Sequence, residues 1–182
     1  MKNNQIGIIG TGYWGTNIVN VLQKIGSKKI YCHDNNIKNL SELKKKFPKI
    51  IIESDFKKFL NNKLDGVIIS VDTKLHFNIA KKCLDKGFNI FVEKPVTDSI
   101  KKLKSLDKLA RSRNLFIMCG YIYYYNDYIK YIKKILNKNY LGKIFYVSCE
   151  RLNLGPVRSD INSAWDLSSH DVAICNYFLI KI

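Results

Sequence analysis

The chain has 182 residues, 46% of them apolar, which is enough for one domain with a hydrophobic core and some chain left over. No apolar stretch approaches the roughly 18 residues of a membrane span, and no apolar signal region precedes the first predicted strand, so a soluble cytoplasmic protein is expected. The net charge of +16 comes from lysines spread over every predicted helix. Solvated helix faces explain this charge better than a nucleic-acid or membrane partner does, and a nucleic-acid partner would need clustered arginines or a recognisable motif.

The five cysteines are odd in number, widely scattered and without a Cys-x-x-Cys pair. Four of them lie in apolar runs, which predicts reduced thiols in the core. No group of cysteines and histidines has the spacing of metal ligands, so no metal site is predicted.

A glycine-rich loop follows the first predicted strand. Gly10, Gly12 and Gly15 occupy the positions of the G-x-G-x-x-G pattern, and the helix predicted after the strand begins inside it with Tyr13 and Trp14. The glycines permit a tight turn, a close backbone approach to a pyrophosphate, and close packing of the helix on the strand. The positive end of the helix dipole would face the phosphates. The loop therefore predicts dinucleotide binding.

A second strand is predicted over residues 29–33. Asp34 follows it directly, about 20 residues after the glycines. An acid at this spacing accepts hydrogen bonds from the hydroxyls of the adenosine ribose. Its charge would repel the 2'-phosphate of NADP, and Asn35 and Asn36 provide no arginine to receive that phosphate. The predicted cofactor is therefore NAD rather than NADP.

Strands and helices alternate with short connections through the rest of this part of the chain, which predicts an α/β fold with a doubly wound parallel sheet. Further strands are expected at residues 50–52, 66–70, 89–92 and 115–119, and helices at 13–25, 37–47, 55–60, 74–86 and 99–113. Thr73 is expected to cap the helix at 74–86. We assign residues 1–119 to a Rossmann dinucleotide-binding domain.

The composition becomes aromatic-rich at Gly120, where a second, α+β domain over residues 120–182 is expected to begin. It would contain a helix up to residue 138, a strand over residues 143–152, a polar loop and a closing apolar helix. Asp166 and His170, four residues apart, would share one face of a helix, so the carboxylate can orient the imidazole. The alternative is a helix start in which Asp166 or Ser168 is only an N-cap.

Lys94 follows the fifth predicted strand, between Glu93 and Pro95. Ligands of open α/β sheets bind at the carboxyl ends of strands, so Lys94 is a candidate residue of the binding or catalytic site. The alternative is a solvated lysine beside Glu93, before a proline that opens a helix. Ser70, at the end of the fourth strand, and His76, which opens the next helix on the cofactor side, are candidate cofactor contacts. The other candidates outside the glycines and Asp34 are Tyr13, Trp14, Glu93, Lys94 and Pro95.

The order of these motifs resembles the Gfo/Idh/MocA oxidoreductases, a family of mostly sugar-directed, nicotinamide-dependent dehydrogenases. The resemblance covers the whole chain and is carried by residues 10–15, 73–76 and 93–95 and by the pair of Asp166 and His170. It implies that Lys94 reaches the reacting hydroxyl and the nicotinamide, and that a cis bond precedes Pro95. His170 would take the hydroxyl proton while hydride leaves for the nicotinamide, and its ordinary pKa of about 6.5 suits that task.

The segment from residue 151 to residue 171 is similar to a branch of this family associated with nucleotide sugars or amino sugars, which implies a sugar or nucleotide-sugar substrate. The candidate substrate contacts are Tyr125, Arg151, Arg158, Asp160 and Asn162. A non-catalytic nucleotide sensor and a basic nucleic-acid-binding module stay open as alternatives, although the presence of both Lys94 and His170 argues against a sensor.

The resemblance also implies a large antiparallel sheet after the helix that carries His170, where it forms the floor of the substrate site and the oligomer interface. A single strand cannot form that sheet, and the sequence stops inside an apolar segment. We therefore expect a truncated reading frame or a fragment that holds NAD but is poor in turnover, and a homo-oligomer for a full-length form.

Overall fold

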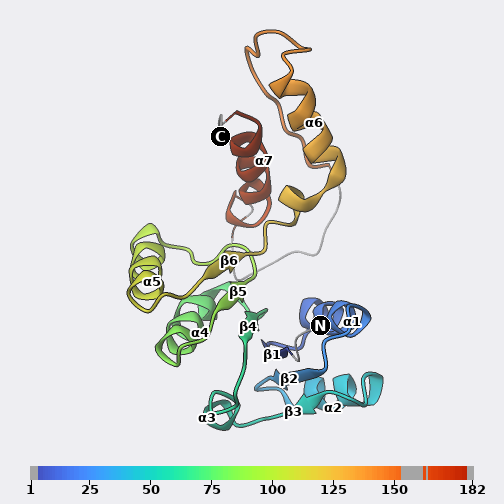
Figure 1. Cartoon of the computed structure of the whole chain (residues 1–182), viewed down its shortest axis with the longest axis vertical. Coiled ribbons are helices and arrows are strands. Elements are labelled where there is room, and N and C mark those ends of the chain that lie inside the picture. Colours follow the sequence, from blue (N-terminus) through green and yellow to red (C-terminus); the bar gives the residue numbers. More distant parts are fainter. Residues whose placement is uncertain (1–3, 153–161, 163, 180–182) are drawn as a thin grey trace. The chain divides into compact units, whose positions relative to one another are not determined.

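A computed structural model of the chain describes residues 4–152, 162 and 164–179 (Figure 1). The chain divides into two compact units, Met1–Cys119 and Gly120–Ile182. The boundary falls where the sequence becomes aromatic-rich. That the second unit is an incomplete substrate domain stays a prediction.

The first unit is built on a parallel sheet whose strands lie in the order β3-β2-β1-β4-β5-β6. The strands are β1 (Gln5–Ile9), β2 (Lys29–His33), β3 (Ile51–Ile52), β4 (Gly66–Ile69), β5 (Ile90–Val92) and β6 (Ile117–Cys119). The chain adds β2 and β3 on one side of β1 and then β4 to β6 on the other, so the order reverses between β1 and β4. Ligands of open α/β sheets bind at such a switch point, outside the carboxyl ends of the strands. The predicted doubly wound α/β fold is confirmed.

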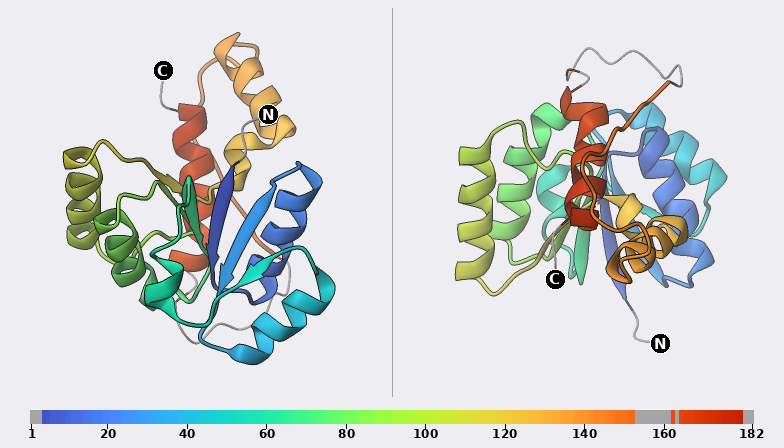
Figure 2. Two further views of the ribbon diagram at one scale, coloured as in Figure 1. Left: turned by 60° about the horizontal axis from the view of Figure 1, so that its bottom comes forward. Right: turned by 90° about the horizontal axis from the view of Figure 1, so that it is seen from above.

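Helices cover both faces of this sheet, with α1 and α2 on one face and α4 and α5 on the other (Figure 2). Their bounds are α1 (Tyr13–Lys24), α2 (Ile37–Lys46), α3 (Phe56–Phe59), α4 (Thr73–Asp85) and α5 (Ile100–Ser112). Neighbouring strand residues point to opposite faces, and Ile8 and Ile9 of β1 accordingly enter two different clusters of buried side chains. The cluster of Ile8 includes Val19 of α1, whereas that of Ile9 includes Leu84 of α4. Because both faces of β1 are covered, its apolar residues follow one another without alternation.

The predicted elements of the first unit agree with the structure to within one or two residues, but the predicted cap of α4 is wrong. Thr73 is the first residue of α4, and the N-cap position is Asp72, whose backbone is extended. The reason is that the first turn closes one residue earlier than expected, since the Leu75 N–H already donates to the Asp72 carbonyl at 2.9 Å.

The second unit contains, in its described residues, helices joined by irregular segments. These helices are the 3₁₀-helix η1 (Ile122–Tyr125), α6 (Asp127–Asn137), the π-helical turn η2 (Ala164–Ser168) and α7 (Ser169–Leu179). The Asn126 side chain caps α6 by accepting hydrogen bonds from the backbone N–H groups of Tyr128 and Ile129. Throughout the described part of the chain, no helix combines the length and the apolar character needed to cross a bilayer.

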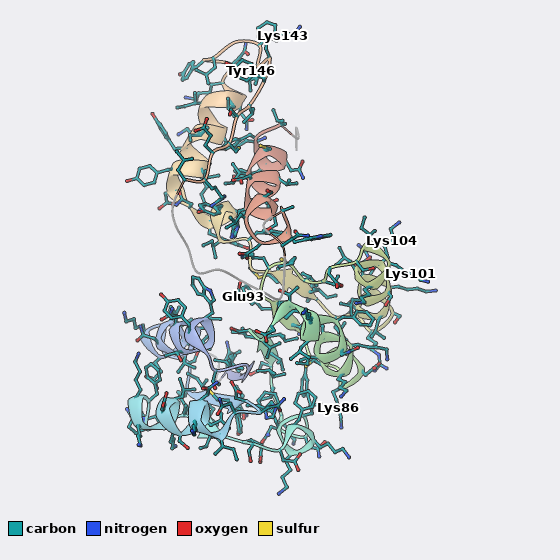
Figure 3. The ribbon with its side chains drawn as sticks, turned by 180° about the vertical axis from the view of Figure 1, so that it is seen from behind. Lys86, Glu93, Lys101, Lys104, Lys143 and Tyr146 are labelled. Atoms are coloured by element: carbon teal, nitrogen blue, oxygen red, sulfur yellow. The ribbon has the colours of Figure 1, made fainter. Side chains whose placement is uncertain are left out.

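The strand predicted over residues 143–152 is wrong. This described segment, in which Figure 3 labels Lys143 and Tyr146, forms no strand. Phe145 and Tyr146 are 82% and 86% exposed. A strand requires backbone hydrogen bonds to a neighbouring strand, and the described part of the second unit provides none. Cys149, in the same segment, is therefore exposed, whereas Cys32 and Cys83 are buried in the core as predicted.

Candidate functional site

The loop between β1 and α1 passes directly over the end of β4. Gly10 has a φ of +92°, a conformation that favours glycine, and a Cβ atom at this position would lie 2.5 Å from the Ser70 carbonyl oxygen. The Gly10 N–H donates to the His33 carbonyl at 2.9 Å, which also ties the loop to the end of β2. Glycine is therefore required here by the path of the chain itself.

Gly15 and Gly12 have different roles at the start of α1. A Cβ atom at Gly15 would lie 2.0 Å from the Gly10 carbonyl oxygen, so only glycine lets the helix pack on the loop. Gly12, at the N-cap, has a φ of −66°, and a Cβ atom there would meet no heavy atom of the described residues within 4 Å. Within those residues, no side chain caps α1 and its first turn holds no acid, while Tyr13 and Trp14 are exposed. The start of α1 thus presents open space and N–H groups suited to a pyrophosphate.

Asp34, directly after β2, holds the glycine-rich loop through Thr11. Its Oδ2 atom accepts hydrogen bonds from the Thr11 N–H at 2.7 Å and from Thr11 Oγ1 at 2.9 Å. Further bonds come from the Asn36 N–H at 2.8 Å and from Asn39 Nδ2 at 3.3 Å. Burial raises the pKa of Asp34, but these hydrogen bonds together outweigh burial and hold the pKa below its ordinary value. Asp34 is therefore ionised at neutral pH, which suits an acceptor for ribose hydroxyls.

We expect Asp34→Asn to lower the free energy of unfolding at pH 7 by about 1 kcal/mol, because hydrogen bonds to a charged acceptor are replaced by neutral ones. Since the folded-state pKa of Asp34 is depressed, the stabilisation is present above the unfolded pKa of about 3.9 and is lost as pH falls through the folded pKa. Urea unfolding of both proteins should therefore give curves that converge at acid pH. Asp107→Asn, at an exposed carboxylate of α5, is the control. A stability difference that stays constant down to acid pH would contradict this role.

The ends of β1, β4 and β5 lie side by side, so the residues that follow them share one edge of the sheet. At this edge the Ser70 N–H donates to the Ile9 carbonyl at 2.8 Å, and the Glu93 N–H donates to the Ile69 carbonyl at 2.9 Å. The glycine-rich loop, Ser70 and Glu93 are thereby brought to the switch point of the sheet, where the predicted cofactor site lies.

The Ser70 hydroxyl is an unsatisfied polar group at this edge. Its Oγ atom is buried and has no hydrogen-bond partner among the described residues. It lies 3.7 Å from the position that a Cβ atom of Gly15 would take, which places it beside the first turn of α1. A buried hydroxyl without a partner is costly, and a ligand at the start of α1 would supply one. The residues present therefore fit a bound dinucleotide.

Lys94 and Glu93 follow β5 at the same edge, and both side chains are half-buried. The peptide bond between Lys94 and Pro95 is cis, as the family resemblance implies. The Glu93 carboxylate accepts a hydrogen bond from the Lys94 N–H at 3.3 Å, and burial, opposed by Lys94, raises the pKa of Glu93. Glu93 therefore contacts the backbone of the turn that carries Lys94.

The His76 ring is 1% exposed and lies between two carbonyl groups of the site. Nδ1 is 2.8 Å from the Pro95 carbonyl oxygen, and Nε2 is 2.9 Å from the Val71 carbonyl oxygen. His76 thus joins the loops that follow β4 and β5. Its direct contact with a cofactor stays a prediction.

In the second unit, His170 lies in the first turn of α7 and Asp166 in the π-helical turn before it. The ring of Tyr123 meets the His170 ring edge-on, with 5.0 Å between the ring centroids, and Tyr121 does so at 6.3 Å. These rings restrict how the imidazole can turn. The orientation of His170 by Asp166 stays a prediction, as does its joint action with Lys94, which belongs to the first unit.

Arg151 is held within the second unit by Asp171. Its Nε atom lies 3.0 Å from each Asp171 carboxylate oxygen, and its guanidinium lies 5.4 Å from the centroid of the Tyr123 ring. Both charged side chains are 22% exposed, and the hydrogen bonds to Asp171 raise the pKa of Arg151 further. In the structure, the Arg151 guanidinium is paired with Asp171. Its contact with a substrate stays a prediction. Sequence reasoning missed Asp171 as its partner, although Asp171 directly follows His170.

The other substrate candidates have different surroundings. Asn162 caps the π-helical turn, since its Oδ1 atom accepts a hydrogen bond from the Trp165 N–H at 3.1 Å. Asp166 and Ser168 lie inside this turn, so neither of them is its N-cap. Tyr125, in η1, is 62% exposed. Arg158 and Asp160 lie outside the described residues.

Thr11 is a second site residue that sequence reasoning missed. The signal available was a hydroxyl side chain between the first two glycines of the loop, a position that the G-x-G-x-x-G pattern leaves open. No group of three or more His, Cys, Asp or Glu side chains in residues 4–152, 162 and 164–179 could hold a metal ion.

Comparison with known proteins places this geometry in a family. The model of the Gfo/Idh/MocA oxidoreductases with an NAD-binding Rossmann fold matches residues 4–121. The chain is 23% identical to the 2,7-anhydro-N-acetylneuraminate hydratase of Mediterraneibacter gnavus, over 83% of this chain and 40% of the relative. It is 30% identical to the UDP-N-acetylglucosamine 3-dehydrogenase of Acidithiobacillus ferrooxidans, over 60% of this chain and 34% of the relative. The chain thus spans well under half the length of these curated relatives.

A solved structure supports the same fold. The scyllo-inositol dehydrogenase of Lactobacillus casei with bound NAD(H) and scyllo-inositol superposes with a TM-score of 0.78 at 21% identity, over 97% of this chain and 56% of that one. Because the identity is low, this likeness concerns the fold alone. The family model, in contrast, covers most of the chain and includes the glycine-rich loop and residues 93–95. The chain therefore belongs to the Gfo/Idh/MocA family of oxidoreductases and contains its NAD-binding Rossmann domain.

Proposed function

We propose that the first unit binds NAD(H) in preference to NADP(H), and that the protein transfers hydride between this cofactor and a hydroxyl-bearing carbon of a sugar or nucleotide sugar. The observation that carries the proposal is the shared edge of β1, β4 and β5, where the glycine-rich loop, the unsatisfied Ser70 hydroxyl and Lys94 come together. The names of the relatives support the substrate class, since they act on a UDP-sugar, a sialic-acid derivative and an inositol.

In this proposal, a nicotinamide cofactor held at this edge would supply the hydride acceptor, and the protein groups hold the reactants and move the proton. The open space at Gly12 and the N–H groups of α1 receive the pyrophosphate, while Asp34 accepts from the adenosine ribose. The Lys94 ammonium stabilises the negative charge that develops on the substrate oxygen. His170 accepts the hydroxyl proton on a ring nitrogen, with Asp166 orienting the imidazole.

We expect NADH to bind at least about 10-fold more tightly than NADPH, equivalent to about 1.4 kcal/mol. The Asp34 carboxylate is ionised at neutral pH and repels a 2'-phosphate, and the adjacent Asn35 and Asn36 carry no compensating charge. Fluorescence titration with both reduced cofactors measures the ratio, and Asp34→Asn should bring it closer to one. Equal or tighter NADPH binding by the wild-type chain would exclude this role for Asp34.

The substrate part of the proposal is tested separately, by following NADH formation with a panel of nucleotide sugars, amino sugars and inositols. Turnover of one class identifies the substrate. Tight NADH binding without turnover of any of them would instead support the non-catalytic nucleotide sensor.

A further inference from the structure

His76 connects two strand ends at a point where the sheet no longer does. The last backbone bond between β4 and β5 runs from the Glu93 N–H to the Ile69 carbonyl. Beyond this bond, the His76 ring joins the segments that follow β4 and β5. Its Nδ1 lies 2.8 Å from the Pro95 carbonyl oxygen, and its Nε2 lies 2.9 Å from the Val71 carbonyl oxygen. Val71 follows Ser70 and Pro95 follows Lys94, so the ring spans the two loops of the candidate site.

The chemistry of these partners determines the protonation of the ring. A carbonyl oxygen only accepts hydrogen bonds, and a neutral imidazole has only one N–H to donate. In either neutral tautomer, one ring nitrogen would direct its lone pair at a carbonyl oxygen less than 3 Å away. Only the imidazolium donates at both nitrogens, and both observed distances are those of good hydrogen bonds.

We propose that His76 is a doubly protonated positioning residue that holds the loops of Ser70 and Lys94 in place by donating to the Val71 and Pro95 carbonyls. The protonation state stands on the geometry of the first unit alone. Its consequence for hydride transfer rests on the proposed function. Positioning of this kind matters because small displacements of a catalytic group lower the rate strongly.

Some features around the His76 ring disfavour its protonated form, and others favour it. His76 lies in the first turn of α4, where the helix dipole disfavours a cation, and burial disfavours it as well. The two carbonyl dipoles favour the charged form in this dry location. Charged groups on the flanking segments are Asp72 and Lys74 at the start of α4, Glu93 and Lys94 after β5, and Asp98 before α5.

The protonation state can be measured directly by NMR on the ¹⁵N-histidine-labelled full chain at pH 7. The chain has three histidines, so His76→Asn identifies the His76 signals by their loss. We expect both His76 nitrogens to show the shifts of protonated ring nitrogens. His33 is the internal reference for a buried histidine with one ring nitrogen near a carbonyl oxygen, since its Nδ1 lies 2.9 Å from the Glu53 carbonyl oxygen. A His76 pattern with one unprotonated nitrogen at pH 7 would overturn the proposal, whether or not the chain binds NADH.

The positioning role is measured by hydrogen exchange and kinetics. His76→Phe keeps a ring but removes both donors, so amide exchange in residues 93–97 should become about 10-fold faster or more. His76→Gln, which keeps one donor, should give a smaller change. In turnover, kcat should fall by about 10-fold or more while the Kd for NADH changes by less than about 3-fold. Unchanged exchange in His76→Phe would overturn the positioning role, and absence of NADH binding in the wild-type chain would instead count against the proposed function.

Discussion

Replacing Gly15 by alanine is expected to weaken NADH binding by a factor of about 100 or more, equivalent to about 3 kcal/mol. The new Cβ atom would lie 2.0 Å from the Gly10 carbonyl oxygen, which is a backbone atom and cannot rotate away as a side chain can. Gly10 is itself fixed against Ser70, so the strain cannot be relieved by a small shift of the loop. Either α1 moves outward or the loop opens, and both displace the N–H groups that receive the pyrophosphate. The free energy of unfolding should also fall, by about 1–3 kcal/mol.

Alanine substitutions at two other glycines distinguish an effect on NADH binding from an effect on folding stability. Gly12→Ala adds a Cβ atom that meets no described heavy atom within 4 Å, at a φ of −66°, so the free energy of unfolding should fall only by the cost of alanine at an N-cap, about 1 kcal/mol or less. NADH binding should nevertheless weaken, because the methyl group takes space that the pyrophosphate requires. Gly66→Ala, at the far end of β4, has its nearest contact at 3.4 Å and should leave binding unchanged. If Gly12→Ala binds NADH as the wild type does, the pyrophosphate does not lie in front of α1.

The fold of the first unit was predictable because its signals are local. The alternation of apolar strands with periodic helices, and the glycines that end and begin them, specify a parallel sheet without knowledge of distant contacts. The cofactor loop was predictable for the same reason, since the positions of Gly10, Gly12 and Gly15 have steric causes that the structure shows. The spacing of Asp34 was sufficient to place it at the same edge of the sheet.

The residues that hold the site together were less predictable, because their partners are distant in sequence. Thr11 binds Asp34 across 23 positions, and His76 binds the Pro95 carbonyl across 19. A backbone carbonyl has no signature in the sequence, so a histidine that donates to one cannot be distinguished from a histidine that contacts a ligand. The wrong strand at residues 143–152 has a related cause, since a strand depends on a partner that the segment itself does not specify.

Lys94→Ala is expected to lower kcat by about 10² to 10⁴ on the sugar or inositol substrate identified for the protein, while the Kd for NADH changes by less than about 3-fold. Lys94 follows β5 beside the cofactor edge and outside the glycine-rich loop, so its ammonium would act on the substrate oxygen and not on the pyrophosphate. Removing a charge that acts mainly on the developing alkoxide lowers kcat and kcat/KM together. His170→Ala should cause a loss of similar size and should also remove the acidic limb of the pH profile.

Lys104→Ala provides the matched control, because Lys104 is an exposed lysine on α5 whose side chain points away from the sheet (Figure 3). It removes the same charge from the same unit, which carries a large excess of lysine, so a general electrostatic effect on an anionic cofactor or substrate would lower activity in both variants alike. We expect Lys104→Ala to retain the wild-type kcat. Near wild-type turnover in Lys94→Ala would show that Lys94 is the solvated lysine of the alternative interpretation. An equal loss in both variants would show that the long-range positive field, and not a group at the end of β5, supports the reaction.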